Sequence, residues 1–485
     1  MLGYPISSYS LRMFWIDIGS FSLLVSCLAL VCLFEFVNGF HDTANAVAPV
    51  IYTKSLEPKK AVVLSGVMNF FWVVLWGIGV AMGIIHLLPL DVIAEQSTAF
   101  WVSVVLALLI SAIIWNAGTW YLGIPASSSH SLIGSILWVS IAMMLLPIHS
   151  SFTIVPNWHK ATEVIQSLLI SPLIGFWLAA LVMVLSLKFI SSREYFSRPG
   201  KFFHRHPKTW LRSMLIATSA WVSFAHGSND GQKGVGLAML ILISLAPSMF
   251  AINPDIKTSE FKDDILYVWQ TVEILSSEGG LSQEKIQTLD STKKHIYEIQ
   301  ELLNTPSVHP LKIRMWVLEL QKDFKALGSI GGSSLTQVHA DGVVWTVDAQ
   351  EFERRTTNIS STIDYAPKWI IILISLSLWL GTMVGWRRIV VTIGEKIGKE
   401  KLNYAQATTS ALITAITISL ASKLALPVST THVLSSSVAG SMTSGKHAWI
   451  QGNTVKSILM AWILTLPVTI VLSGSIFTVL WYALG

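Results

Sequence analysis

Apolar residues dominate this chain in runs long enough to cross a lipid bilayer. About twenty consecutive apolar residues span the hydrocarbon core as an α-helix. Runs of this order lie near residues 16–52, 61–88, 98–122, 125–147, 164–190, 213–250, 367–386, 405–426, 427–443 and 457–483. The pattern predicts an all-α polytopic membrane protein with about ten membrane segments.

The first and sixth runs are longer than one span requires, and they carry Gly, Asn and Asp where an ordinary span carries leucine. We expect broken or re-entrant helices there, because glycine permits a break and polar side chains need a partner or a cavity inside the membrane. A polar stretch, residues 253–366, precedes the seventh run. Its helical-looking pieces predict a small extramembrane helical insertion.

Charge is scarce and unevenly distributed. Only 13% of the 485 residues are charged, about half the fraction usual in a soluble domain. Residues 253–366 carry 17 acidic and 11 basic side chains, whereas the rest of the chain carries 11 acidic and 22 basic ones. Short loops at 53–60, 191–213 and 387–403 are rich in Lys and Arg. Such loops mark the cytoplasmic side, so both termini and the insertion are expected outside. The basic charge belongs to loops beside a membrane, so no nucleic-acid partner is expected.

Two pairs of short motifs reveal an internal repeat. The matching segments are 39–48 with 227–236, and 125–130 with 427–432. Asp42 and His130 are 88 positions apart, whereas Asp230 and His432 are 202 positions apart. The surplus equals the 114 residues of the insertion, so removing it brings the two halves into register.

The repeat predicts a transporter architecture. With five crossings in each half, the second half enters the membrane from the opposite side, which makes the halves inverted repeats with a site near the midplane. The expected parts are a first membrane repeat (1–190), a basic cytoplasmic linker (191–212), the start of the second repeat (213–252), an extracytoplasmic insertion (253–366) and the remainder of the second repeat (367–485).

Ionisable residues inside the predicted spans mark a candidate ion site. A charge near the bilayer centre costs at least about 2.5–3.5 kcal/mol, so such residues usually face a transport path. We assign Asp42, Asp230 and Asn229 to a coupling ion, because carboxylates repel an anion and attract a cation or a proton. The alternative is a buried ion pair of an aspartate with Lys233 that only locks the helices together.

Hydroxyl groups follow a proline in both halves, at two expected helix starts. A helix N-terminus favours anions, and hydroxyls and amides can donate to their oxygens. The candidate substrate-binding residues are Asn45, Ser127, Ser128, Ser129, Lys233, Ser429, Thr430 and Thr431. Ordinary N-capping is the alternative for either turn alone. His41, His130, His432 and Glu35 are assigned supporting roles, with no catalytic residue and no identified metal ligand.

These motifs resemble the inorganic phosphate transporter (PiT) family, specifically its bacterial low-affinity type. The resemblance rests on the strings Asn38–Ala46, His226–Gly234, Gly385–Arg388 and Ile393–Gly398, and on both Pro-Ser turns. It implies ion-coupled phosphate symport in a bacterial inner membrane. The family motif reads Gly-Ala-Asn-Asp-x-Ala-Asn-Ala in both halves, but here Lys233 replaces the second Asn. An ammonium repels Na⁺, and the bacterial members that this sequence resembles use protons and carry phosphate as a neutral metal–phosphate complex. The resemblance therefore implies proton coupling and the same form of phosphate here.

Other functions stay open at this point. They are a sodium-coupled phosphate symporter, a sulfate symporter, an intramembrane hydrolase using Ser128 or Ser129 with His130, and an anion channel. We expect no resident cofactor, only protons or Na⁺ as the coupling ion. The expected partners are inorganic phosphate and membrane lipid, and a homodimer is left open.

Overall fold

The computed structural model describes most of the chain as two compact units. It covers residues 18–85, 87, 96–145, 158–199, 207–277, 281–305, 309–328, 335–340, 343–399, 401–443 and 450–484. One unit, here called the membrane unit, comprises Val25–Leu240 and Ala366–Gly485. The other, the inserted unit, comprises Ile241–Tyr365 and the start of the chain up to Leu24.

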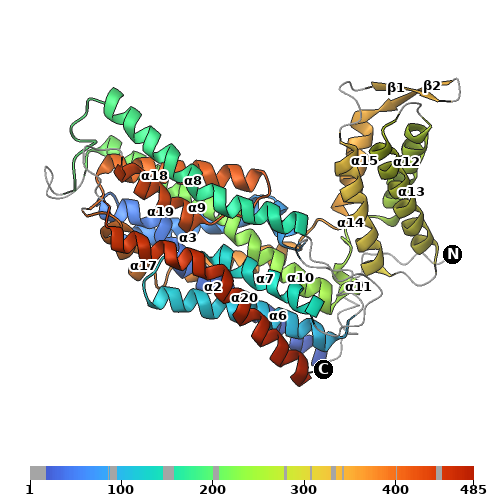
Figure 1. Ribbon diagram of the computed structural model, residues 1–485, viewed down its shortest axis with the longest axis horizontal. Helices are drawn as coiled ribbons and strands as arrows, with labels where there is room; N and C mark the ends of the chain where they lie inside the picture. The colour runs from blue at the N-terminus through green and yellow to red at the C-terminus, as the bar shows by residue number, and fades with distance from the viewer. Residues whose placement is uncertain are drawn as a thin grey trace. The chain divides into compact units, whose positions relative to one another are not determined.

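The membrane unit is helical, and the same order of elements occurs twice along the chain (Figure 1). The first series is α2 (Ile18–Tyr52), α3 (Pro58–Leu75), α4 (Gly79–Ile85), α6 (Thr98–Tyr121), α7 (Ser128–Leu145) and α8 (Trp158–Phe189). The second is α9 (Thr209–His226), the π-turn η2 (Gly227–Gly231) and α10 (Gln232–Leu245), then α16 (Lys368–Thr382), α17 (Arg387–Val391) with η3 (Thr392–Lys396), α18 (Tyr404–Lys423), α19 (Thr430–Thr443) and α20 (Gly452–Leu484).

Among the described residues, five helices are long and apolar enough to cross a membrane. A sixth candidate is the pair Lys368–Thr382 and Arg387–Lys396, which is bent by 57° at its break. Ser128–Ala142 is a shorter apolar helix. These features fit a multi-pass membrane protein, while the count of ten segments stays a prediction.

The breaks predicted around the two aspartates were wrong. α2 continues from Ile18 to Tyr52 without interruption, and the sixth run widens into a π-turn at Gly227–Gly231 without a break there. That run is interrupted only near its end, at Ala246 between α10 and α11. Thr43 donates a hydrogen bond to the carbonyl of Gly39 one turn earlier, which is compatible with a helix. The polar side chains find tertiary partners, so the backbone need not open to solvate them.

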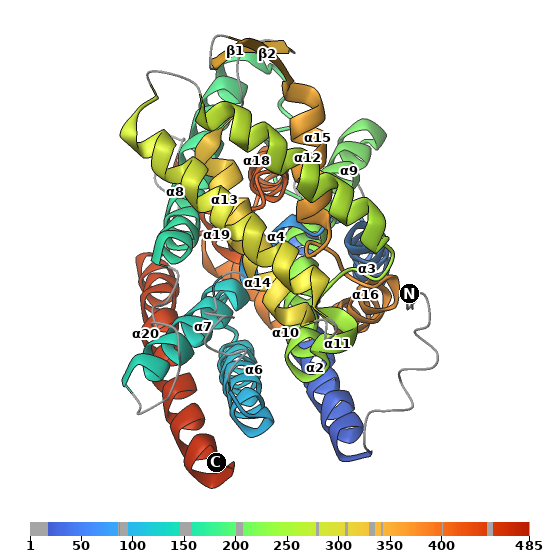
Figure 2. The same cartoon turned by 90° about the vertical axis from the view of Figure 1, so that its right-hand side faces the viewer.

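The final helix of each half packs on the other half. α8 packs against α18 and α19, which lie beside it in Figure 1, and α20 packs against α6 and α7, which lie beside it in Figure 2. Glycines allow close approach: a Cβ on Gly440 of α19 would lie 2.1 Å from the carbonyl oxygen of Phe176 in α8. The two series of helices therefore form one interlocked body.

Replacing Gly440 with alanine is expected to lower the unfolding temperature, because α8 and α19 must separate to admit the methyl group. Overpacking of this kind costs about 1–3 kcal/mol. Gly118→Ala in α6 is the control, because a Cβ there meets nothing within 4 Å. Thermal unfolding in detergent measures both variants. Equal unfolding temperatures for Gly440→Ala and the wild type would contradict this packing.

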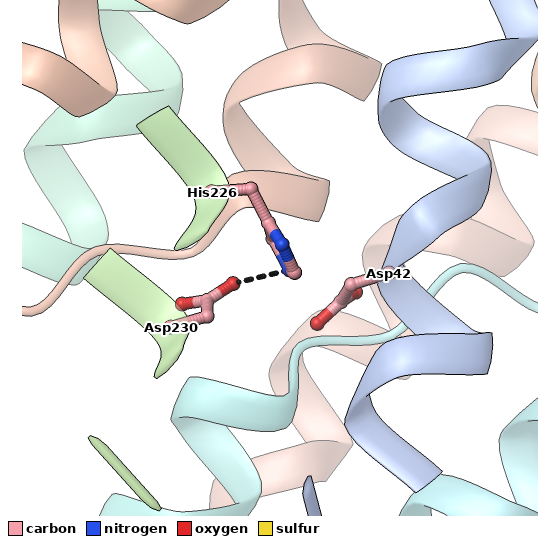
Figure 3. Close-up of side chains that lie close together, drawn as sticks. All are labelled: Asp42, His226 and Asp230. Carbon is pink, nitrogen blue, oxygen red and sulfur yellow. Dashed lines mark ion pairs between the residues drawn. The ribbon is translucent and has the colours of Figure 1, made fainter. Parts of the chain in front are cut away.

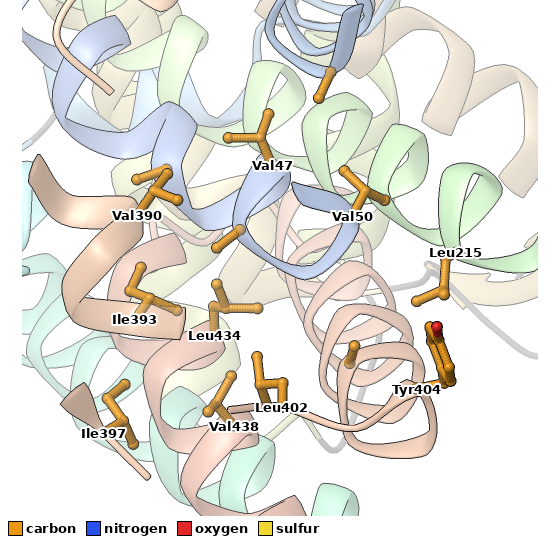
Figure 4. Close-up of a cluster of buried hydrophobic side chains, with 14 of the residues drawn as sticks. Val47, Val50, Leu215, Val390, Ile393, Ile397, Leu402, Tyr404, Leu434 and Val438 are labelled. Atoms are coloured by element: carbon orange, nitrogen blue, oxygen red, sulfur yellow. The ribbon is translucent and has the colours of Figure 1, made fainter. Parts of the chain in front are cut away.

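An apolar cluster holds the C-terminal part of α2 in place (Figure 4). Val47 and Val50 of α2 belong to the same cluster as Leu215 of α9 and Tyr404 of α18. Other members come from α17, η3 and α19: Val390, Ile393, Leu434 and Val438. Since Asp42 lies only five residues before Val47, this packing helps to fix its position.

The inserted unit has its own core. Its elements are α11 (Pro247–Phe250), α12 (Thr258–Ser276), α13 (Gln283–Asn304), α14 (Pro310–Leu327), β1 (Leu335–Ala340), β2 (Val343–Asp348) and α15 (Ala349–Ser361). Buried residues such as Val268, Ile296 and Val317 pack between its helices. The predicted all-helical insertion was wrong in one part, because β1 and β2 form an antiparallel hairpin with Leu335 opposite Asp348. Buried Arg314 donates to the carbonyls of Ala251 and Ile363, which joins the two ends of the insertion.

Candidate functional site

The two aspartates predicted from the repeat lie close together inside the membrane unit (Figure 3). Asp42 lies within α2, and Asp230 lies in the π-turn that links α9 to α10. The two hydroxyl turns directly precede the helices that begin at Ser128 and Thr430. These helix starts agree with the expectation drawn from the prolines, whereas no backbone N–H groups are freed at the aspartates, because neither helix breaks there.

The carboxylate of Asp42 joins hydroxyls from both halves of the chain. Ser128 donates to Oδ2 at 2.7 Å, and Thr431 donates to Oδ1. His41 Nδ1 lies 3.2 Å from Oδ1, and Asn45 Nδ2 lies 3.4 Å from the same atom. Because hydrogen bonds to a charged acceptor are stronger than neutral ones, Asp42 tethers the starts of α7 and α19.

The carboxylate of Asp230 has a corresponding set of partners. Thr430 donates to Oδ2 at 2.9 Å, and the Lys233 ammonium contacts Oδ1. His226 Nε2 lies 3.0 Å from Oδ2. Thr430 is the counterpart of Ser128 in the internal repeat, so each aspartate accepts a bond from the matching hydroxyl of its own half.

Lys233 occupies the structural place that Asn45 holds in the first half. Asn45 Nδ2 contacts Asp42 three residues earlier and donates to Thr431 at 2.8 Å. Lys233 Nζ contacts Asp230 three residues earlier and donates to Ser129 at 2.5 Å, and Ser129 is the counterpart of Thr431. Lys233 also donates to the carbonyl of Val428 at 2.9 Å. The geometry is repeated, but an ammonium replaces a neutral amide.

Ser127 and Ser429 cap the two helices. The oxygen of Ser127 accepts the backbone N–H of His130 at 3.1 Å, and that of Ser429 accepts the N–H of His432 at the same distance. Ser127 also bonds His130 Nδ1 at 2.8 Å. In this structure the two serines thus act as N-caps, which was the alternative to substrate binding. Their role in binding substrate stays a prediction.

The two turn histidines contact each other. The ring centroids of His130 and His432 are 4.4 Å apart with the rings tilted by 39°, and His432 stacks on Trp462 with the ring centroids 3.9 Å apart. Both rings are almost fully buried. These contacts join the two turns, and the supporting role assigned to the histidines stays a prediction.

Two predicted site residues lie beside this centre without contacting the aspartates through hydrogen bonds. Asn229 donates to Ser422 and to the carbonyl of Leu426, and its oxygen accepts the N–H of Val428. Glu35 is fully buried, accepts a bond from Asn38 at 3.3 Å, and packs against Gly234, the neighbour of Lys233.

Sequence reasoning missed two residues of the site, His226 and Asn69. His226 contacts Asp230 through one ring nitrogen, and its other nitrogen lies 3.1 Å from Asn69 Oδ1 in α3. The spacing of four residues between His226 and Asp230 places both on one helix face, and this signal could have identified the histidine. Asn69 is an isolated polar residue in an apolar helix, so only the packing of α3 reveals its role.

The centre combines negative charge with strict burial. Asp42, His226 and Asp230 each offer a ligand atom within 4.8 Å of the other two, an arrangement that could hold a cation. Each named side chain of the site has an exposed fraction of 3% or less. With neutral histidines, two carboxylates and one ammonium leave a net charge of about −1. A phosphate anion therefore requires protons or a cation beside it.

Comparison with known proteins agrees with the resemblance noted in the sequence. The model of the phosphate transporter family matches residues 38–473. The low-affinity inorganic phosphate transporters PitB and PitA of Escherichia coli K12 are 38% and 37% identical to this chain. The alignments cover 97% and 95% of this chain, and 98% and 97% of those proteins.

More distant similarities extend over the same length. A probable low-affinity inorganic phosphate transporter of Bacillus subtilis is 26% identical, with 94% of this chain and 98% of that protein aligned. A solved structure titled "The sodium-dependent phosphate transporter" shares the fold, with a TM-score of 0.55 and 17% identity over 95% of this chain and 99% of that one. With a family model across most of its length and close relatives covering nearly all of it, this multi-pass membrane protein belongs to the phosphate transporter family.

Proposed function

We propose that this protein imports inorganic phosphate by proton symport, at a site between two inverted repeats. The observation that carries the proposal is that the hydroxyls of both turns donate to Asp42 and Asp230. A hydroxyl has a single proton to donate. The same hydroxyls can thus bind either the carboxylates or the oxygens of phosphate, but not both at once.

This competition supplies a mechanism for coupling. A proton or a cation on Asp42 or Asp230 removes the negative charge that holds Ser128, Thr430 and Thr431. These hydroxyls then turn toward phosphate at the N-termini of α7 and α19, where the helix dipoles favour an anion. Coupled binding follows because each ligand improves the site for the other.

The repeated hydrogen-bond pattern and the exchange of α8 and α20 between the halves support the inverted-repeat plan. Alternating access would then rock one set of helices against the other around the aspartates. A divalent cation that enters with phosphate could be held by Asp42, His226 and Asp230. The divalent cation would neutralise the negative charge of phosphate. In this proposal the transported species is a neutral metal–phosphate complex.

Sodium coupling is the second candidate, and one observation favours it. The amide oxygen of Asn45 is buried and has no hydrogen-bond partner among the described residues, and it lies on the same residue that contacts Asp42. An unused oxygen beside a carboxylate is a suitable ligand for Na⁺. In the second half Lys233 places an ammonium at the equivalent position, which argues for protons there.

A hydrolase is not supported. Its proposed base, His130, bonds Ser127, while Ser128 bonds Asp42 and Ser129 bonds the carbonyl of Val428. Neither candidate nucleophile is thus paired with His130 in these contacts. The named relatives are transporters.

Uptake of labelled phosphate into proteoliposomes, with pH, Na⁺ and Mg²⁺ varied separately, tests the proposal. We expect saturable uptake that collapses with a protonophore, requires Mg²⁺ and resists excess sulfate. Uptake that follows a Na⁺ gradient and ignores the protonophore would replace proton coupling with sodium coupling. Non-saturable flux would indicate a channel, and full competition by sulfate would change the substrate.

A further inference from the structure

A basic pocket lies where the end of α6 meets the bend between α16 and α17. Its volume is about 670 Å³. The lining residues are Trp120, Tyr121, Leu122, Gly123, Gly385, Trp386, Arg387, Arg388, Val391 and Lys396. Three of them carry positive charge and none is acidic. A pocket of this composition suits an anion.

Its three cations differ in how firmly they are held. The Arg388 guanidinium donates to the carbonyl of Tyr121 at 2.6 Å and lies 5.0 Å from the centre of the Trp120 ring. All three are exposed, Arg388 as well as Arg387 and Lys396. The neighbouring carboxylate of Glu395 pairs with Lys401 at 3.1 Å. The pocket therefore combines one oriented guanidinium with two cations that are free to meet a ligand.

A layer of two aromatic side chains, Trp120 of the pocket and Phe40 of α2, lies next to the histidine that contacts Asp42. Trp120 Nε1 donates to the carbonyl of Gly385 at 2.8 Å, and the Trp120 ring lies 4.8 Å from that of Phe40. Gly385 has a φ of +78°, and a Cβ there would lie 3.0 Å from Phe40 Cβ, so the layer is tightly packed. Directly behind it His41 contacts both Asp42 and Thr119.

The positions that correspond to Phe40 and Trp120 in the other half carry polar side chains. In the register of the repeat, Ser228 matches Phe40 and Ser422 matches Trp120. These two serines share a hydrogen bond of 3.2 Å. Hydroxyls can bind a passing anion or water, whereas two packed aromatic rings offer no hydrogen bond to a phosphate oxygen. An anion that reaches the basic pocket is therefore held there until the rings separate.

We infer that the basic pocket is a second phosphate-binding site on the transport path, and that Phe40 and Trp120 form the barrier between it and the aspartates. The inference rests on the proposed function, because it takes phosphate as the ion that passes. Arg387 and Lys396 lie in the basic segment 387–403, which the charge pattern predicts to be cytoplasmic, so the pocket would receive phosphate leaving for the cytoplasm. The headgroup of an anionic lipid offers the same phosphate chemistry.

The test replaces two of the three exposed cations together, as Arg387→Gln with Lys396→Gln, and leaves intact Arg388, which is oriented by Tyr121 and Trp120. Lys399→Gln is the matched control, because Lys399 is exposed on the same segment but does not line the pocket. Phosphate transport is measured in inside-out and right-side-out membrane vesicles. We expect the KM of the double variant to rise about tenfold for phosphate presented on the pocket's face, with kcat and the KM on the other face unchanged.

Ionic strength provides a readout that a merely structural role would not move. The KM of the wild type should rise with salt on the pocket's face, because salt screens exposed charges, and the KM of the double variant should not. Proteoliposomes of phosphatidylcholine alone, compared with ones that also contain phosphatidylglycerol, separate the two sources of phosphate. A KM effect in both membranes supports binding of free phosphate.

Several outcomes would overturn the inference. If the double variant differs from the wild type only when phosphatidylglycerol is present, the pocket binds lipid. If its KM equals that of the wild type or of Lys399→Gln, the pocket does not bind phosphate. In both cases the proposed function stands, whereas a wild-type protein that moves no phosphate would remove the proposed function itself.

Discussion

Replacing Asp42 or Asp230 with asparagine is expected to lower coupled phosphate uptake at least about a hundredfold. The amide cannot take up a proton or hold a cation as the carboxylate does, and its NH₂ group opposes the hydroxyls that now donate to the aspartates. Hydrogen bonds to charged groups contribute about 1.5–3 kcal/mol each, and about 2.8 kcal/mol corresponds to a hundredfold change. Initial rates of labelled phosphate uptake into proteoliposomes measure the effect.

Asp323→Asn is the matched control for these variants. Asp323 lies in the inserted unit and, like the site aspartates, accepts a hydroxyl and contacts a histidine, with Ser291 at 2.8 Å and His295 at 2.7 Å. This variant should keep wild-type uptake even if its unfolding temperature falls. Wild-type uptake rates in both Asp42→Asn and Asp230→Asn would remove the site assignment.

Replacing Lys233 with asparagine should change which cation drives uptake. The variant gives the second half the same Asp and Asn pair as the first, without the ammonium that repels Na⁺. We expect uptake to lose its sensitivity to a protonophore and to gain a dependence on Na⁺. Removing the ammonium also leaves Asp230 buried without its cationic partner, which costs about 3–5 kcal/mol. Na⁺ should restore part of that stability, because a ligand that binds only the folded state stabilises it.

Thermal unfolding in Na⁺ and in K⁺ medium, together with uptake under both cations, measures the Lys233 effect. Lys60→Asn is the control, since Lys60 forms an exposed pair with Glu57 at 3.2 Å and exposed pairs contribute about 0–1 kcal/mol. It should unfold near the wild-type temperature in either medium. Unchanged uptake and unchanged cation dependence in Lys233→Asn would remove the basis for proton coupling.

Much of the membrane unit follows from local sequence. The apolar runs predict its helices, and the prolines before Ser128 and Thr430 predict where two of them begin. The breaks expected around Asp42 and Asp230 were wrong. Glycine within a span can permit a break, or it can allow a second helix to approach closely, and the sequence pattern does not distinguish these two uses. Gly39 illustrates the second use: a Cβ there would lie 2.4 Å from the carbonyl oxygen of Leu378 in α16, so it serves helix contact and not a break.

The hairpin of the inserted unit and the contact of His226 with Asn69 could not be predicted from the sequence. β1 and β2 form through cross-strand pairing, and helical patterns elsewhere in the insertion do not reveal it. His226 meets Asn69 only because α3 packs against α9. The hydrophobic periodicity of the sequence indicates neither contact, because the packing of the folded chain decides which residues meet.

The sequence by itself determined that this chain has two related halves, which residues form the motif pairs, and that Lys233 breaks their symmetry. Repeated motifs survive as patterns along the chain, and a change of residue type is visible there directly. The tertiary structure alone decided that Thr431 reaches Asp42 and that Lys233 reaches Ser129, each across the two halves. Those bonds depend on tertiary packing, because only three-dimensional packing brings residues so far apart in the chain within hydrogen-bond distance.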